Sequence, residues 1–246
     1  MSDGSNAEVG VSALVDKILR ETDALTNPYF RALVDGSMTR EEFVETQAQF
    51  YLAVIFFNRP MAALAAKIPY AALRMEVLRN VWEEHGEGDP GKVHGKTFVT
   101  LMERLAGVDE RELARRTLWP EVRIFNTTLA GACVLDEYLI GAAMLGMIER
   151  TFCDVSHLLG TAIVARGWLE ADQMIHYNLH KDLDIKHSQD FFDVLEPAWR
   201  ENPENRYYIE QGLRMGATLF DGLYMGLYRG RGRRWFREVL GPHSRA

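Results

Sequence analysis

The sequence predicts an all-α protein, a compact antiparallel bundle of about eight to ten helices. Helical periodicity extends along almost the whole chain, whereas strand-type alternation and hairpin turn signals are scarce. Apolar residues make up 47% of the 246 residues, which is enough for a sizeable core. Because no linker rich in Pro, Gly or Ser divides the chain, we expect one domain over residues 1–246, with flexible tails at 1–9 and 236–246.

Capping signals mark helix starts in the first quarter of the chain. Asn27 followed by Pro28 indicates a cap and a proline at the first helical position. Thr39 and Glu42 form a capping-box pattern that opens a long helix. We expect that helix to end before Pro60, because proline disrupts a helix interior. The other helices of ten residues or more are expected at Val11–Glu21, Asn126–Arg150, Asp154–Arg166, Ala171–Leu195 and Asn205–Arg229.

The composition argues against nucleic-acid-binding, secreted and membrane-spanning proteins. Lys and Arg number 28 against 35 Asp and Glu, a net charge of −7, whereas nucleic-acid backbones need clustered positive charge. The N-terminus carries no signal-peptide pattern, and Cys133 and Cys153 are too few for a disulfide framework, so we expect buried thiols in a cytoplasmic protein. The nearly uncharged stretch 126–148 contains Asp136 and Glu137, which favours a core helix over a membrane span.

A group of polar side chains near residue 180 has the spacing of a metal-binding helix. His180, Asp184 and His187 fall within about 60° of one another around a helix axis. Two imidazoles and a carboxylate on one stripe are a coherent ligand set for a first-row transition metal. The alternative is a solvent-exposed polar face, but the neighbouring Leu183 and Ile185 are apolar.

A second candidate pair, Glu84 and His94, flanks a break in helical periodicity. The stretch Gly86–Gly91 interrupts the helix that Glu84 ends, and His94 opens the next one. Such a break is what brings the two side chains together, because on a straight helix they would lie about 15 Å apart. The alternatives are an exposed carboxylate beside a helix-start histidine, or His85 in the place of His94.

Glu149 ends a run of Ala, Met, Leu and Gly and is expected to face the interior. A buried glutamate needs a partner or a metal, because desolvating it unpaired costs several kcal/mol. A salt bridge to Arg150 or Lys186 is the alternative. No ferritin-type Glu-x-x-His, P-loop, Gly-x-Gly-x-x-Gly or Gly-x-Ser-x-Gly pattern is present, which leaves nucleotide binding and serine hydrolysis without a motif.

Two parts of the chain resemble the TenA/PqqC-like superfamily, whose members share the haem-oxygenase-like all-α fold. Its opening is resembled by Asn27–Phe43 and Gln47–Tyr51. Its metal-binding subgroup, the haem-oxygenase-like di-iron oxidases, is resembled by Asn80-x-x-Glu-Glu84 with His94, by Glu149, and by His180-x3-Asp184-x2-His187. The resemblance covers roughly residues 11–230. Plain TenA thiaminases and PqqC lack the full set, so the resemblance favours a metal enzyme.

The resemblance implies two Fe(II) ions, with manganese as the alternative metal, and O2 as co-substrate. In such enzymes a peroxo-di-iron(III) species attacks an unactivated C–H bond or transfers oxygen to an amine. One iron would be held mainly from the Glu84 and His94 side and the other from the side of His180, Asp184 and His187. The candidate bridging carboxylates are Glu149, Glu84 and Asp184, and the resemblance does not assign the bridges among them. The implied ligands are Glu84, His94, Glu149, His180, Asp184 and His187. His176 either orients a ligand or is an ordinary surface histidine.

We expect a small aliphatic amino acid or its derivative as substrate, in specialised metabolism. Its carboxylate would need a cation such as Arg59, Arg150 or Lys186. The alternatives are a fatty-acid oxidative decarboxylase, oxidation of the protein's own Tyr29, and a metal-free TenA/PqqC-like binding protein or cysteine-dependent hydrolase. A homodimer and an external reductant are further expectations, with no nucleic-acid or membrane partner.

Overall fold

The computed structural model describes residues 10–237, apart from the side chains of residues 179–182. The described chain is helical, as predicted, and an isolated bridge between Arg116 and Phe236 is its β-type pairing. The helices are α1 (Val11–Thr22), η1 (Ala24–Thr26), α2 (Pro28–Val34), α3 (Arg40–Lys67), α4 (Ala71–Glu84), η2 (Gly86–Gly88), α5 (His94–Ala106), α6 (Glu110–Ala114), α7 (Pro120–Val134), α8 (Tyr138–Ala165), η3 (Ala171–Gln173), α9 (Ile175–Glu201) and α10 (Pro203–Gly230).

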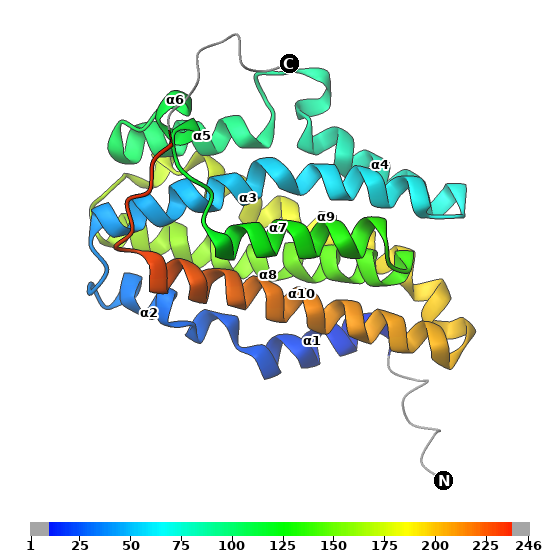
Figure 1. Ribbon diagram of the computed structural model, residues 1–246. Coiled ribbons are helices and arrows are strands. Elements are labelled where there is room, and N and C mark those ends of the chain that lie inside the picture. Colours follow the sequence, from blue (N-terminus) through cyan, green and yellow to red (C-terminus); the bar gives the residue numbers. More distant parts are fainter. Residues whose placement is uncertain (1–9, 238–246) are drawn as a thin grey trace.

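Helix α8 occupies the middle of the bundle. It packs along α9 and α10, while α3 packs against α7, and α4 and α5 each contact both α3 and α9. Figure 1 shows α3, α7, α8 and α10 extending alongside one another, with α1 and α2 along one side and α4, α5 and α6 at the other. Most of α8 is buried, from Leu139 to Ile163. A polar side chain on the inner face of α8 therefore lies far from bulk water.

Two glycines set the close approach of α10 to α8. A Cβ at Gly212 would lie 2.5 Å from the carbonyl oxygen of Ile140, and a Cβ at Gly216 would lie 2.7 Å from the carbonyl oxygen of Met144. Since both obstacles are backbone atoms, neither can rotate away. Small residues one turn apart are therefore what lets these two helices pack backbone against backbone.

We expect Gly212→Ala to lower the free energy of unfolding by about 1–3 kcal/mol, the usual cost of overpacking. Gly222→Ala is the matched control, because Gly222 lies on the same helix and a Cβ there would meet no atom of a neighbouring element within 4 Å. That control should leave stability unchanged or raise it by up to about 1 kcal/mol, since alanine is the better helix former. Urea denaturation measures both values. Equal stability of the two variants would contradict the close packing.

Helix α3 continues through Pro60, so the expected break before this residue is wrong. Proline removes one backbone hydrogen bond and crowds the preceding turn, at a cost of about 3 kcal/mol. The residues after it, Met61 and Leu64, are fully buried, and α3 packs against α4, α5, α7 and α8. The burial of apolar side chains along this helix offsets the cost of the proline. Local helix propensity does not include this tertiary contribution.

The helix boundaries predicted around residues 126–166 are also wrong. Instead of Asn126–Arg150 followed by a helix from Asp154, the chain forms α7 and α8 with a turn at residues 135–137. Asp154 lies inside α8 and does not start a helix; there it pairs with Arg150 one turn earlier, at 3.0 Å. No helix in the described ranges combines the length and apolar character needed to cross a bilayer.

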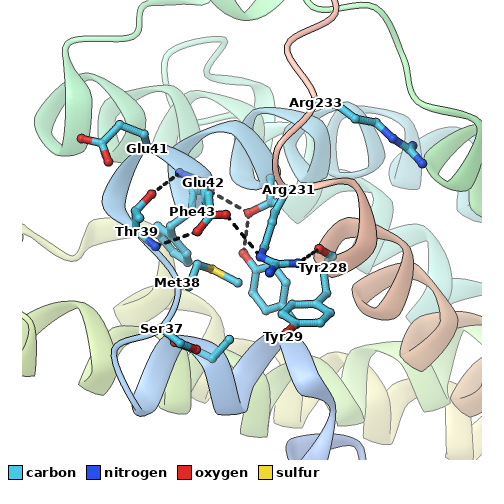
Figure 2. Close-up of polar contacts among 12 residues, drawn as sticks. Tyr29, Ser37, Met38, Thr39, Glu41, Glu42, Phe43, Tyr228, Arg231 and Arg233 are labelled. Carbon is cyan, nitrogen blue, oxygen red and sulfur yellow. Dashed lines mark hydrogen bonds and ion pairs between the residues drawn. The ribbon is translucent and has the colours of Figure 1, made fainter.

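The start of α3 is held to the end of α10 (Figure 2). Thr39 and Glu42 form the predicted capping box, with Thr39 Oγ1 accepting from the Glu42 amide at 3.1 Å. Glu42 Oε1 also lies 3.3 Å from Arg231 Nε, and Arg231 donates to the Tyr228 carbonyl. The chain then returns over the bundle, where the Arg237 amide donates to the Arg115 carbonyl. Of the predicted tails, 1–9 and 238–246 lie outside the described residues.

Candidate metal centre

Four helices supply the predicted ligands. Glu84 is the last residue of α4 and His94 the first of α5, so the loop between them turns both side chains toward α8 and α9. Gly86 makes that turn with a φ of +73°, and a Cβ there would lie 2.8 Å from the backbone of Lys92 and Val93. The predicted break in periodicity is therefore a tight turn, and this turn brings Glu84 and His94 together.

A glycine also brings α8 against α9 beside Glu149. Gly146 lies about one turn before Glu149, and a Cβ there would lie 2.8 Å from the Phe192 ring and 2.9 Å from Phe191 Cβ. Phe191 in turn lies about one turn after His187. This close approach places Glu149 of α8 level with Asp184 and His187 of α9.

The structure brings three predicted ligands into one cluster. One ligand atom from each of Glu84, Glu149 and His187 lies within 4.8 Å of the others, and all three side chains are buried. His94 joins this cluster through Glu84, since His94 Nδ1 lies 2.7 Å from Glu84 Oε1. The rings of His94 and His187 lie nearly parallel, with centroids 6.4 Å apart. Imidazole and carboxylate donors at this spacing fit a divalent first-row metal.

The electrostatics of the cluster favour a cation. Burial raises the pKa of Glu149 well above its ordinary value of 4.5, and the charges of Asp184 and Glu84 raise it further. Glu149 Oε1 and His187 Nδ1 are buried and meet no hydrogen-bond partner in the described part of the chain. Such atoms are costly unless something binds them, and a metal ion would satisfy both at once. The residues present therefore fit a metal site.

The two remaining predicted ligands, His180 and Asp184, belong to α9. Asp184 is fully buried, and its charge acts on both Glu149 and Cys153, which places it close to the cluster. His180 lies outside the described residues, because the structure describes only its backbone. Ligation by His180 stays a prediction from its spacing to Asp184 and His187.

The alternatives to this ligand set were His85 as a ligand and a salt bridge from Arg150 or Lys186 to Glu149. In the structure all three side chains contact other groups. His85 is exposed, with its Nδ1 2.6 Å from the Val81 carbonyl oxygen, whereas His94 is buried against Glu84. The expected salt-bridge partners of Glu149 are also occupied, since Arg150 pairs with Asp154 at 3.0 Å and Lys186 with Glu83 at 2.7 Å. The geometry thus favours His94 over His85 and a metal over a salt bridge at Glu149.

Sequence reasoning missed one residue of the site, Glu83. Its Oε2 lies 2.7 Å from His187 Nε2 and its Oε1 lies 2.7 Å from Lys186 Nζ. The signal was present in the paired Glu83-Glu84, but a helix points adjacent side chains about 100° apart. Only the position of α9 shows that the first glutamate faces His187 from outside the cluster.

A small cavity adjoins the carboxylates. Its volume is about 50 Å³, and Glu84, Glu149 and His176 are the polar residues among its described lining. His176 is fully buried there, with its Nδ1 3.0 Å from Thr97 Oγ1, so it is not a surface histidine. The rest of the lining is apolar, namely Phe50, Ala53, Val54, Phe57, Phe125, Ile148, Phe152 and Phe220.

Tyr29 and the two cysteines have surroundings that argue against a reactive role. Tyr29 is not part of the described cavity lining, and its hydroxyl is bonded to Thr46 and Gln47 at 2.7 Å each. Cys133 and Cys153 are buried free thiols, as predicted. Burial raises the pKa of both to about 12, so little thiolate forms at neutral pH, which argues against a cysteine nucleophile.

Two known proteins are similar in sequence to this chain over most of its length. The chain is 26% identical over 203 residues to a 4-aminobenzoate synthase of Nitrosomonas europaea, covering 78% of this chain and 80% of that protein. A 4-aminobenzoate synthase of Chlamydia pneumoniae is 21% identical over 193 residues, covering 78% of this chain and 84% of that protein.

Solved structures share the fold at low sequence identity. A CADD-like protein of unknown function from Nostoc punctiforme superposes with a TM-score of 0.75 at 14% identity, over 90% of this chain and 96% of its own. A TenA homologue from P. horikoshii gives 0.69 at 12% identity, over 88% and 99%. These likenesses confirm the haem-oxygenase-like fold. The model of a family of iron-containing redox enzymes matches residues 44–221, which include every predicted ligand, and this chain belongs to that family.

Proposed function

We propose that this protein is an O2-dependent di-iron oxidase that acts on a small substrate. The observation that carries the proposal is the buried cluster of Glu84, Glu149 and His187, whose ligand atoms lie within 4.8 Å of one another. Its membership of a family of iron-containing redox enzymes supports iron over other divalent metals. The proposed ligands are those of the sequence prediction, Glu84, His94, Glu149, His180, Asp184 and His187.

Two iron ions bound there would supply the electrons and the coordination sites that O2 activation requires. The side chains do the rest. Glu149 comes from the middle of α8, while Glu84 and His94 come from the facing ends of α4 and α5 and Asp184 and His187 come from α9. The surrounding phenyl groups exclude water, which would otherwise compete for the reactive centre.

We propose that the substrate presents an uncharged, apolar carbon group to this centre. The cavity beside Glu84 and Glu149 is lined by five phenylalanines, and no Arg or Lys is among its described lining. The cations considered for an amino-acid carboxylate lie elsewhere, since Arg150 and Lys186 are in ion pairs and Arg59 is exposed. If the substrate is an aliphatic amino acid, its side chain enters this cavity and its charged groups stay outside.

A second candidate is the formation of 4-aminobenzoate, the activity in the names of the two relatives. The phenyl-lined cavity favours it, because planar rings pack well against aromatic side chains. Growth of a 4-aminobenzoate auxotroph on this protein, with the product confirmed by mass spectrometry, tests it. Growth that the His187→Ala variant also supports would contradict a role for this site.

The decisive test of the oxidase is iron stoichiometry after anaerobic loading with Fe(II). We expect about two irons per chain and an increase in Tm, since a ligand at 100 times its Kd stabilises the native state by about 2.7 kcal/mol. For a chain of this size that corresponds to roughly 5–10 °C. When the iron-loaded protein is then mixed with O2, it should consume O2 and its iron should be oxidised. Only trace iron at neutral pH would overturn the proposal.

A pair of histidine variants separates the site from its surroundings. We expect His94→Ala to lose at least one iron and O2-dependent turnover, because its imidazole lies against Glu84 in the cluster. His85→Ala is the matched control, because that histidine is exposed and contacts a backbone carbonyl. It should keep both irons and full turnover. The reverse pattern would assign the ligand to His85.

A further inference from the structure

The carboxylate of Glu83 connects two residues of α9, one of them in the cluster. Its Oε2 lies 2.7 Å from His187 Nε2, and its Oε1 lies 2.7 Å from Lys186 Nζ. His187 is fully buried, while Glu83 is 16% exposed and Lys186 is 48% exposed. The three side chains therefore form a chain of contacts from the surface to the cluster.

The contact with Glu83 decides how His187 is oriented. The Lys186 ammonium lies 2.7 Å from Glu83 Oε1 and has only hydrogens to donate, so it pairs with a carboxylate. The other oxygen of that carboxylate, Oε2, can only accept a hydrogen bond, and it lies 2.7 Å from His187 Nε2. His187 Nε2 must then carry the hydrogen of this contact. In a neutral imidazole the other nitrogen, Nδ1, is left with a lone pair.

That second nitrogen is the one without a partner. His187 Nδ1 is buried and accepts no hydrogen bond from the described residues, and His187 contributes an atom to the cluster with Glu84 and Glu149. A histidine that binds a metal through one nitrogen commonly donates from the other to a carboxylate, which sets both the tautomer and the direction of the ring.

We infer that Glu83 is a positioning residue for the metal centre. With Lys186 as its counter-ion, it holds His187 in the Nε2–H tautomer and aims the Nδ1 lone pair at the space between Glu84 and Glu149. This inference rests on the proposed function, because it assigns the purpose of the contact to metal binding. It adds a fourth carboxylate to the site, one that touches a ligand and not the metal.

Anaerobic titration with Fe(II), and with Co(II), whose visible absorption reports its ligands, tests the inference. We expect Glu83→Leu to weaken metal binding by about 10- to 100-fold, the usual effect of removing the partner of a ligand. Glu83→Gln should recover part of the affinity, because its amide oxygen still accepts from Nε2–H. Glu76→Gln is the matched control on the same helix, since Glu76 pairs with Arg79 on the surface. It should bind like the wild type.

The tautomer itself gives a readout that needs no metal. In ¹⁵N spectra of the histidine side chains of the metal-free protein, His187 should carry its hydrogen on Nε2. We expect Glu83→Leu to shift this signal toward a mixture of tautomers, while Glu76→Gln leaves it unchanged. A Glu83→Leu variant with wild-type affinity and an unchanged tautomer would overturn this inference alone. Wild-type protein that binds neither metal would overturn the proposed function, and this inference with it.

Discussion

Glu149→Gln should abolish O2-dependent turnover and, in the same protein, raise the stability of the metal-free form. The amide is a far weaker ligand than a carboxylate, so we expect turnover to fall by more than about 100-fold, beyond the effect of losing a ligand's partner. Without metal, however, Glu149 is buried near the negative charges of Asp184 and Glu84, and this repulsion disappears in the amide. The gain should be about 1–3 kcal/mol at neutral pH.

The pH dependence of this gain follows from the pKa of Glu149. The pKa is raised in the folded protein and ordinary, near 4.5, in the unfolded chain. Between these two values the unfolded chain has released the proton that the folded protein keeps, so rising pH favours unfolding. Metal-free wild-type protein should therefore lose stability as pH rises above about 4.5, and the Tm difference from Glu149→Gln should widen over that range.

Thermal unfolding of both metal-free proteins at several pH values, before and after adding Fe(II), measures this prediction. Thr151→Ser is a matched control on α8, because it is buried close to Glu149 but keeps its hydroxyl bond to the Met147 carbonyl. It should retain turnover and the wild-type response to Fe(II). A metal-free Glu149→Gln protein that is less stable than the wild type at neutral pH would show that Glu149 has a stabilising partner.

Ala53→Leu should strongly lower turnover and leave the iron content unchanged. Ala53 is buried on α3 and lines the cavity of about 50 Å³, so three additional carbon atoms occupy the space proposed for the substrate. No predicted ligand belongs to α3, so the metal centre should stay intact. We expect kcat/KM to fall at least about tenfold, which corresponds to about 1.4 kcal/mol of lost transition-state binding.

Overpacking itself costs about 1–3 kcal/mol, so a control must share that cost. Ala65→Leu is such a control, because Ala65 is fully buried on the same helix but does not line the cavity. It should lose stability and keep turnover. Phe220→Leu makes the opposite change, enlarging the cavity, and should admit bulkier substrates. Full turnover by Ala53→Leu would place the substrate elsewhere.

Much of the site could be predicted because its signals are local. The stripe of Asp184 and His187 depends only on helix geometry, and the break after Glu84 depends on glycines adjacent in the chain. Glu149 could be predicted as buried because the residues that precede it on its helix, 139–148, include no charged side chain. That these residues meet in one site was implied only by a family resemblance.

Other features depend on contacts between distant segments. Pro60 lies inside α3 because burial along this long helix outweighs the local cost of the proline. Similarly, tertiary packing and not local periodicity sets the boundary between α7 and α8 within the apolar run. Glu83 contacts His187 because α9 packs beside α4, and neither helix alone indicates this packing. The cavity likewise combines residues of α3, α4, α7, α8, α9 and α10, which no single stretch of sequence displays.

The sequence by itself determined the helical class, most capping signals and the residue types of the candidate metal centre, because periodicity, turn chemistry and spacing within one helix are properties of adjacent residues. Only the tertiary structure decided that Glu84, Glu149 and His187 meet, that His94 and not His85 joins them, and that a phenyl-lined cavity lies beside them. The physical reason is that helix faces meet through long-range packing, which glycines such as Gly146 permit at close distance.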